Sequence, residues 1–190
     1  MMKYIFKIIF FSIFLINSSL LLSQVNNFDT EKKWFLGVDL GVQMSGIKSE
    51  DFVQSNYSPM IRVVGGKWLN SSFGVQIGYQ GRYFNTIADN DKHFYNFYFF
   101  EGVLNFKNLI LKQKRDNRFY DLVFHAGLGY FQNRFYGNSS IHYVLGAANN
   151  FSLSKKTKIK LDVGAIVGWD IYQGDDDILP NLSLGFIYLF

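Results

Sequence analysis

Apolar and polar side chains alternate with a two-residue period through most of this chain, and this feature restricts the fold more than any other. The stretch from residue 34 to residue 44 is an example. There Leu36, Val38 and Leu40 are separated by Gly37 and Asp39. Successive side chains of a β-strand point to opposite faces, so this spacing predicts a strand with one apolar face and one small or polar face. Three further stretches repeat the pattern, at residues 73–84, 120–133 and 158–171.

A last strand at 179–190 places Leu182, Leu184 and Phe186 on one face. Three other stretches, at 60–68, 93–106 and 140–151, have the composition of strands but a less regular alternation. The second of them is aromatic at both odd and even positions. Within it, we expect Glu101 and Asn105 to point inward. We expect Phe100, Leu104 and Phe106 to point outward. The sequence therefore predicts eight strands.

The residues of the polar face decide which face lies inside. A soluble sandwich or a lipocalin-type barrel fills its interior with large apolar side chains at high packing density. Here the polar face combines charges with many glycines, which cannot form a dry core: Gly37, Gly41, Gly74, Gly78, Gly127, Gly129, Gly164 and Gly168. Such residues can line the narrow lumen of an eight-stranded barrel whose apolar face meets lipid. We therefore predict an all-β fold, an eight-stranded antiparallel up-and-down transmembrane β-barrel, closed because a sheet edge in hydrocarbon is costly.

Charged side chains fall on the predicted inner face of this barrel. They are Asp39, Arg82, Glu101, Asp121, His125, Lys158, Lys160, Asp162 and Asp170. An unpaired buried ion is very unfavourable, so we expect these groups to be paired and hydrogen-bonded to one another as part of the structure. The alternative is a functional role, in which they gate ions or bind a small polar ligand.

The N-terminal residues have the features of an export signal. Lys3 and Lys7 accompany an apolar segment from Ile8 to Leu22, and Ser23 precedes a suitable cleavage point. The alternative is a retained membrane anchor, but this apolar segment is shorter than the roughly 20 residues that a spanning helix needs. The predicted domains are a signal peptide at 1–23, a periplasmic N-terminal lead at 24–33 and an outer-membrane β-barrel at 34–190.

Composition excludes several classes of protein. The chain has no cysteine, which rules out disulfides, cysteine metal sites, thiol catalysis and a lipoprotein anchor. Its mean hydropathy of +0.02 is too low for a bundle of membrane-spanning helices. The formal net charge is only +4, and no basic run is long enough to indicate nucleic-acid binding.

The predicted connections differ in length, which indicates an orientation. Residues 69–72 and 153–157 form short turns, as periplasmic turns of such barrels do, whereas residues 45–58 form a long first outer loop. The connection at 107–118 breaks the pattern, since it is long but lies on the periplasmic side. It either extends the neighbouring strands or packs beneath the barrel.

Three groups of residues could carry chemistry. Ser140 and His142 share a strand face, as the nucleophile and base of a lipid-modifying hydrolase would, but no acid that orients the histidine is identifiable. The acidic run 175–177 could recruit Ca²⁺, although a solvated turn explains it as well. Trp34, Trp68 and Trp169 fit an aromatic girdle at the membrane interfaces. We therefore assign no catalytic, cofactor-binding or metal-binding residues and expect no cofactor.

Several short motifs carry a resemblance to a known family. They are GGKWLN at 65–70, FGVQIGY at 73–79, EGVLNF at 101–106, AGLGY at 126–130 and the terminal Phe190. In these the chain resembles the OmpA-like outer-membrane β-barrel domain family, in the form of a Bacteroidetes-type small outer membrane protein. The resemblance implies a barrel of the cell envelope, inserted by the barrel-assembly machinery through its C-terminal strand. It implies no catalytic residues.

The function expected from these observations is that of a non-enzymatic outer-membrane β-barrel protein, a structural or surface-exposed component of the cell envelope. Its expected partners are outer-membrane lipid and lipopolysaccharide, and the assembly machinery; we expect a monomer that binds no nucleic acid. One alternative is an outer-membrane lipid-modifying hydrolase, similar to a lipid A deacylase and using Ser140 and His142. Another is a secreted soluble lipocalin-like carrier. A large porin-like diffusion pore does not fit eight strands.

Overall fold

The computed structural model describes residues 34–45, 57–85, 92–111, 120–169, 171 and 176–190. The predicted signal peptide and periplasmic lead lie outside the described residues, as does Asp170. No helix in the described ranges is long and apolar enough to cross a membrane.

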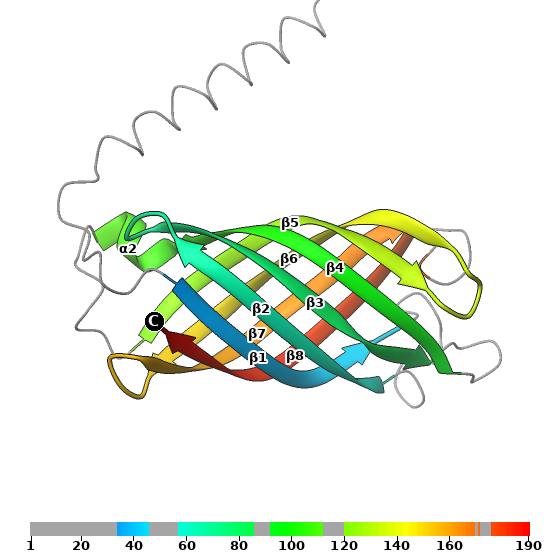
Figure 1. The fold of residues 1–190 in the computed structure, drawn as a ribbon, viewed down its shortest axis with the longest axis horizontal. Coiled ribbons are helices and arrows are strands. Elements are labelled where there is room, and N and C mark those ends of the chain that lie inside the picture. The colour runs from blue at the N-terminus through cyan, green and yellow to red at the C-terminus, as the bar shows by residue number, and fades with distance from the viewer. Residues whose placement is uncertain (1–33, 46–56, 86–91, 112–119, 170, 172–175) are drawn as a thin grey trace, which may run out of the picture. The chain divides into compact units, whose positions relative to one another are not determined.

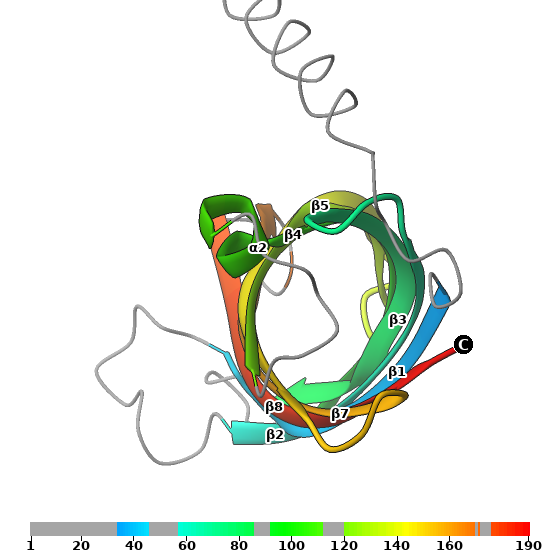
Figure 2. The ribbon, with the colours of Figure 1, turned by 90° about the vertical axis from the view of Figure 1, so that its left-hand side faces the viewer.

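The described chain forms one closed, antiparallel barrel of eight strands in sequential order, which confirms the predicted fold class (Figure 1). Seen along its axis, the sheet closes into a complete ring (Figure 2). The strands agree with the predicted ones to within a few residues at each end. They are β1 (Trp34–Met44), β2 (Tyr57–Trp68), β3 (Phe73–Asn85), β4 (Lys92–Asn105), β5 (Tyr120–Asn133), β6 (Ser139–Ser152), β7 (Thr157–Trp169) and β8 (Asp176–Leu189).

The barrel closes where β1 pairs with β8. Leu40 lies opposite Leu184 in this pairing, and beyond its end the Phe190 backbone N–H donates to the Trp34 carbonyl at 3.0 Å. The closure leaves neither β1 nor β8 with an unpaired edge, which is the condition for a sheet in hydrocarbon.

The strand register fixes the width of the lumen. Following paired residues around the barrel from Phe35 returns the path to β1 about ten residues further along. With the usual strand rise and spacing, that stagger gives a strand tilt of about 40° and a backbone radius of about 8 Å. A lumen of this width is filled by the inward side chains.

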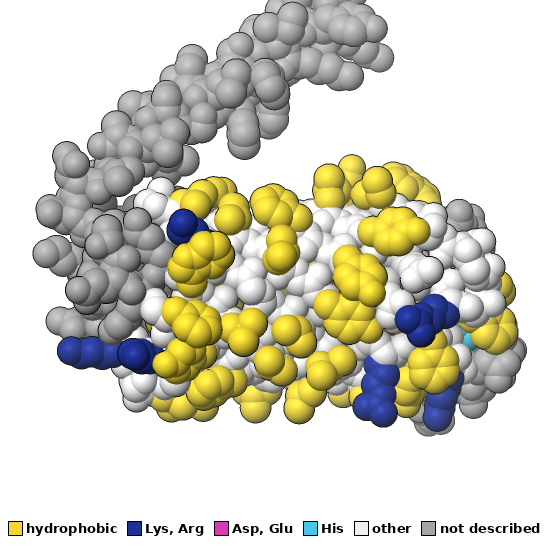
Figure 3. All heavy atoms as spheres, in the orientation of Figure 1, with side chains coloured by type: hydrophobic (Ala, Val, Ile, Leu, Met, Phe, Trp, Pro, Cys, Tyr) yellow, Lys and Arg dark blue, Asp and Glu magenta, His cyan; other side chains and the backbone are white. Residues whose placement is uncertain are grey.

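The outer surface carries a broad apolar band (Figure 3). Leu40, Ile77 and Leu184 are each more than 60% exposed although they lie in mid-strand. The predicted outward residues of β1, from Trp34 to Val42, are exposed in the same way. The direction of the alternation is therefore as predicted, with the apolar face on the outside.

Two tight turns and both ends of the barrel chain lie at the same end of the barrel (Figure 1). In the β2–β3 turn, Asn70 Oδ1 accepts hydrogen bonds from the backbone N–H groups of Ser72 at 2.9 Å and Phe73 at 2.7 Å. In the β6–β7 turn, Ser154 Oγ accepts hydrogen bonds from the backbone N–H groups of Lys156 and Thr157. Short polar side chains therefore close both hairpins locally.

The long connection after β4 begins with a short helix, α2 (Phe106–Leu111), so β4 is not extended beyond Asn105. Asn105 Oδ1 accepts from the Asn108 N–H at 3.0 Å, which caps the first turn. Asn108 Nδ2 in turn donates to the Ser71 carbonyl at 2.6 Å. The Phe106 ring meets the ring of Phe124 edge-on, 5.5 Å between centroids. Of the two predicted arrangements, packing beneath the barrel agrees better with the position of α2 than an extension of β4 does. Residues 112–119 lie outside the described part.

We predict that Leu40→Arg destabilises the folded barrel in lipid. Leu40 lies midway along β1 on the outer face, where an arginine costs about 2–4 kcal/mol near the bilayer midplane. Denaturant titration of the refolded protein in lipid vesicles measures the loss, and Lys155→Arg in an exposed turn serves as the control. An unchanged midpoint for Leu40→Arg would mean that this face does not meet hydrocarbon.

Candidate functional site: the charged lumen

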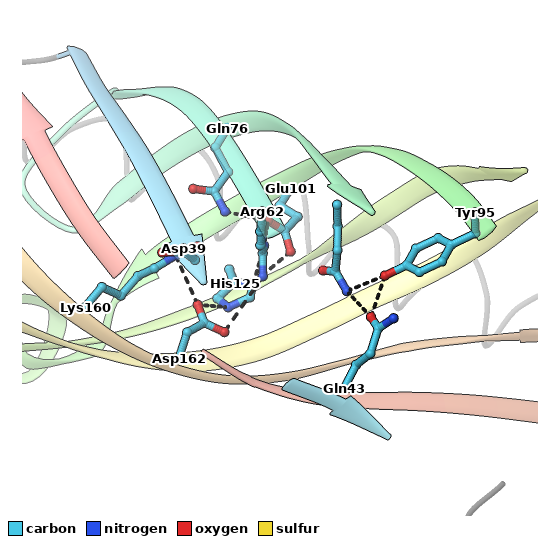
Figure 4. A network of polar contacts seen from close by, with 10 residues as sticks. Asp39, Gln43, Arg62, Gln76, Tyr95, Glu101, His125, Lys160 and Asp162 are labelled. Atoms are coloured by element: carbon cyan, nitrogen blue, oxygen red, sulfur yellow. Dashed lines mark hydrogen bonds and ion pairs between the residues drawn. The ribbon is translucent and has the colours of Figure 1, made fainter. Parts of the chain in front are cut away.

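The centre of the lumen holds a buried ionic network around Arg62 of β2 (Figure 4). The Arg62 guanidinium donates through Nη2 to Glu101 Oε2 of β4 at 2.6 Å, and its Nη1 lies 3.8 Å from Asp162 Oδ1 of β7. Gln76 Nε2 donates to the same Glu101 oxygen at 2.5 Å. The Arg62 guanidinium also lies over the Phe99 ring, 4.6 Å from its centroid. Polar and aromatic contacts thus fix the position of the Arg62 side chain.

His125 of β5 bridges two carboxylates in this network. Its Nδ1 lies 2.7 Å from Glu101 Oε1, and its Nε2 lies 3.2 Å from Asp162 Oδ2. Of these two contacts, the one at Nδ1 has the geometry of a hydrogen bond. The contact at Nε2 is a close approach without that geometry, so the imidazole ring lies between the two carboxylates.

Two lysines of β7 extend the network toward the end of the barrel that carries the tight turns. Lys160 Nζ donates to Asp39 Oδ2 of β1 at 2.6 Å and lies 3.3 Å from Asp162 Oδ2. Lys158 Nζ pairs with Asp121 Oδ2 of β5. Four basic side chains lie against four carboxylates in the described lumen: Arg62, His125, Lys158 and Lys160 against Asp39, Glu101, Asp121 and Asp162.

Glycines make room for these side chains. A Cβ built on Gly185 would lie 1.7 Å from Asp39 Oδ1, and one built on Gly146 would lie 2.6 Å from the His125 ring. Both glycines are on strands that neighbour the charged residue. Any larger residue at these two inward positions would collide with the charged side chain beside it.

The next layer of the lumen is polar but uncharged. Tyr95 Oη donates to Gln43 Oε1 at 2.5 Å, and Gln80 Nε2 donates to Tyr95 Oη at 3.3 Å. Gln43 Nε2 donates to the Tyr83 backbone carbonyl at 2.7 Å. This layer separates the ionic network from the end of the barrel that carries the longer connections (Figure 4).

Beyond it lies an aromatic layer formed by Phe84, Tyr95, Phe97 and Phe131, all at most 1% exposed. The rings of Tyr95 and Phe131 stack at 5.0 Å, and Phe84 lies 5.8 Å from Tyr95. The predicted inner glycines are present in this half, as Gly129 beside Phe97 shows, but aromatic rings stand where ions were predicted. The described rings fill the lumen here.

A cavity of about 30 Å³ lies in the other half, among Asp121, Lys158, Asp162 and apolar neighbours such as Val64 and Ile187. Its volume is close to that of a single water molecule. It is therefore too small to bind an apolar ligand.

Seven of the nine charged residues predicted to face inward do so. Arg82 does not: its side chain is exposed, and its φ of 132° departs from the strand conformation. Asp170 lies outside the described residues. Trp68 and Ile171 were expected on the outer face, yet both are buried. Ile171 follows the end of β7, where the alternation no longer applies, and its carbonyl accepts from Asn133 Nδ2 at 3.0 Å.

The sequence analysis did not identify Arg62, the central cation. The stretch 60–68 was short and contained two successive glycines, so no face was assigned to it. Its alternation does carry the signal, since Met60, Arg62 and Val64 are all buried while Ile61 and Val63 are exposed. Extending the strand back to Tyr57 would have placed Arg62 inside.

Ser140 and His142 meet as the hydrolase hypothesis requires, with Ser140 Oγ and His142 Nε2 2.8 Å apart. However, His142 is fully buried in the lumen, and its ring meets Phe131 edge-on at 5.1 Å. The pair therefore faces the inside of the barrel rather than lipid. Among the described residues, no group of three His, Asp or Glu side chains is arranged to hold a metal ion. The side chains of the acidic run 175–177 lie outside the described part.

No protein-family model and no curated protein sequence matches the chain. Solved structures match its fold. Neisserial surface protein A (NspA) superimposes with a TM-score of 0.59 at 11% identity, covering 83% of this chain and 97% of that one. The N-terminal β-barrel domain of Pseudomonas aeruginosa OprF gives 0.51 at 9% identity, covering 83% and 100%. The outer membrane protein OprG from Pseudomonas aeruginosa gives 0.51 at 8%, covering 86% and 99%.

These likenesses define the class of fold. The chain has the fold of small eight-stranded outer-membrane β-barrels, with a lumen filled by paired charges and aromatic rings. At these identities the likeness concerns the fold alone, and the OmpA-like family assignment stays a prediction.

We predict that Arg62→Met lowers the free energy of unfolding by about 3 kcal/mol or more. The substitution leaves buried carboxylates without their arginine, and breaking a buried pair from one side costs about 3–5 kcal/mol. Guanidinium titration of the refolded barrel measures the change, with Lys156→Gln on the surface as a control that shifts it by less than about 0.5 kcal/mol.

The double variant Arg62→Met with Glu101→Leu should lose less than the sum of the two single variants, because it removes both members of the pair. Additive losses would contradict a direct interaction between these side chains.

Proposed function

We propose that this protein is a non-enzymatic, structural component of the outer membrane of a Gram-negative cell, exposed at the surface through its longer loops. In this proposal it is inserted as a monomer by the barrel-assembly machinery through its C-terminal strand. It contacts outer-membrane lipid and lipopolysaccharide directly. The fold is consistent with such a role and does not by itself specify one.

One observation carries the proposal: the described acidic side chains and the broad apolar face lie on opposite sides of a single closed sheet. Every acidic side chain that the structure describes lies in the lumen, whereas large apolar side chains such as Leu40 and Ile77 point outward. In water this arrangement would expose a broad hydrophobic surface, which soluble monomers avoid. In a bilayer the same surface is satisfied by lipid.

The connections support one orientation. The tight turns at 69–72 and 153–156 lie at the end that also carries the start of β1 and Phe190. The connections at the opposite end include the longer stretch 45–56. Since barrels of this class have short periplasmic turns and longer outer loops, we assign the first end to the periplasm.

The alternatives fit the geometry less well. A soluble lipocalin-like carrier needs a large apolar cavity for its ligand, whereas the cavity found in the described lumen has about 30 Å³ and lies beside charged groups. A lipid-modifying hydrolase needs its nucleophile where the lipid lies, and Ser140 points into the barrel together with His142.

Membrane insertion is tested by fractionation combined with a heat-modifiability gel. We expect the protein in the outer-membrane fraction, resistant to extraction with urea or carbonate. We expect the unboiled protein to migrate differently from the boiled one, because the closed barrel stays folded in detergent. Release into the soluble fraction without detergent would contradict the proposal.

The absence of lipid hydrolysis is tested separately. Cells that express the protein should show the same lipid A acylation as cells that express the Ser140→Ala, His142→Ala double variant, as measured by mass spectrometry. A change in acyl-chain number that depends on these two residues would establish the hydrolase instead.

A further inference from the structure

Three basic side chains lie on the outer surface at the end of the barrel that carries the longer loops. Arg82 is near the end of β3, Lys92 begins β4, and Arg134 follows β5; all three are exposed. Figure 3 shows Lys and Arg side chains gathered at this end of the apolar band, and none of the described side chains visible there is acidic. We call Arg82, Lys92 and Arg134 the basic patch.

The strand register brings the basic patch together. Arg82 is paired with Tyr95 of β4, and the Arg134 backbone N–H donates to the adjacent Phe94 carbonyl of the same strand at 2.9 Å. The two arginines thus flank β4 at nearly one level, about 10 Å apart at the backbone for two strand spacings. Lys92 Nζ lies over the ring of Tyr83, 5.1 Å from its centroid.

Arg82 reaches the outer surface through an unusual backbone conformation. Even-numbered β3 residues such as Gln80 and Phe84 are buried in the lumen, and the alternation would place Arg82 with them. Instead Arg82 has a φ of 132°, the one positive φ among the described non-glycine residues. Such conformations are rare for residues with a Cβ and are concentrated at functional sites. The backbone therefore turns this guanidinium away from the aromatic layer and toward the membrane side.

Arg134 is held in place by neutral groups, not by a carboxylate. With the Asn96 amide turned to the orientation that suits both neighbours, its Oδ1 accepts from Arg134 Nε and Nη2 at 2.9 Å each, and its Nδ2 donates to Tyr79 Oη at 3.0 Å. Asn96 is only 7% exposed, so this support is largely shielded from water. The Tyr79 ring in turn lies over Gly81, where a Cβ would come within 2.2 Å of its hydroxyl. These contacts hold the guanidinium in a fixed position.

The depth of the basic patch matches the lipid headgroups. Phe73 begins β3 at the opposite rim of the apolar band, and nine residues of a tilted strand place Arg82 about 23 Å above it. The apolar band of such barrels is about 25 Å tall. The basic patch is therefore at the upper edge of the hydrocarbon, where the phosphate groups of lipids lie.

The described charges favour an anionic occupant. The acidic side chains whose burial the structure describes all lie in the lumen: Asp39, Glu101, Asp121 and Asp162. The side chains of Asp89 and Asp91, in the connection between Arg82 and Lys92, lie outside the described residues. Arginine matches phosphate geometry well, since its planar guanidinium can donate two parallel hydrogen bonds. A tyrosine-rich apolar surface, including Tyr79 and Tyr98, continues directly below and suits an acyl chain.

We propose that Arg82, Lys92 and Arg134 form a binding site for the phosphate groups of an outer-leaflet phosphorylated glycolipid, the lipid A part of lipopolysaccharide. This inference rests on the proposed function, because it requires the barrel to be inserted with its longer loops outward. Asn96 and Tyr79 position Arg134 and make no contact with the phosphate.

The test uses the mature protein refolded into phosphatidylcholine nanodiscs that contain a small fraction of bis-phosphorylated lipid A. After lipid exchange, mass spectrometry measures how much lipid A stays with the protein. The test variant is Arg82→Gln with Lys92→Gln, which leaves the Arg134–Asn96 contacts intact. The control variant, Lys155→Gln with Lys156→Gln, removes the same charge from the β6–β7 turn at the opposite end.

We expect the test variant to retain about 25-fold less lipid A, since each of the two basic residues removed contributes roughly fivefold at an anionic surface. The control should change retention by less than twofold. Dephosphorylated lipid A should be retained equally weakly by all three proteins. Equal losses in both variants, or retention that does not depend on the phosphates, would overturn the site and leave the proposed function intact. A protein without heat-modifiability that does not insert into the nanodisc would overturn both.

Discussion

The pairing of four buried carboxylates inside a barrel of about 8 Å radius is the constraint on which the rest of the structure depends. Glu101 and Asp162 come from β4 and β7, and neither can be charged in a narrow lumen without a partner. Arg62 and His125 reach both of them from β2 and β5. Because the partners are distant in sequence, these pairs can form only when the sheet has closed with the correct stagger. The ionic network therefore favours one register over others that would satisfy the backbone equally well.

The two-residue alternation of apolar and polar side chains was enough to predict the barrel, because glycines and charges on one face cannot form a core in water. It was also enough to place Asp39, Glu101 and Asp162 inside. It could not predict which groups pair, since this depends on the stagger of eight strands and not on any local pattern. It failed where the alternation ends or is interrupted, as at Ile171 beyond β7 and at Arg82, where a positive φ reverses the direction of one side chain.

The aromatic half of the lumen explains why the stretch 93–106 was ambiguous. Tyr95 and Phe97 point inward, while Phe94 and Tyr98 on the same strand are more than half exposed. The inward rings fill the barrel against Phe131, and the outward rings meet the membrane. Both faces of β4 are therefore aromatic for different physical reasons. Hydrophobic periodicity cannot distinguish a ring that packs in a lumen from one that lies at a lipid interface.

The two groups of charges in this barrel have separate consequences. In the lumen, Arg62 and Lys160 are neutralised by carboxylates within the protein, so their contribution is to stability and to the choice of register. On the outer surface, the charged side chains that the structure describes are all basic, and they include Arg82 and Arg134. The acidic side chains that it describes are all paired inside the barrel. The described part of the rim is therefore cationic, and an anionic lipid is the component of the bilayer that complements it.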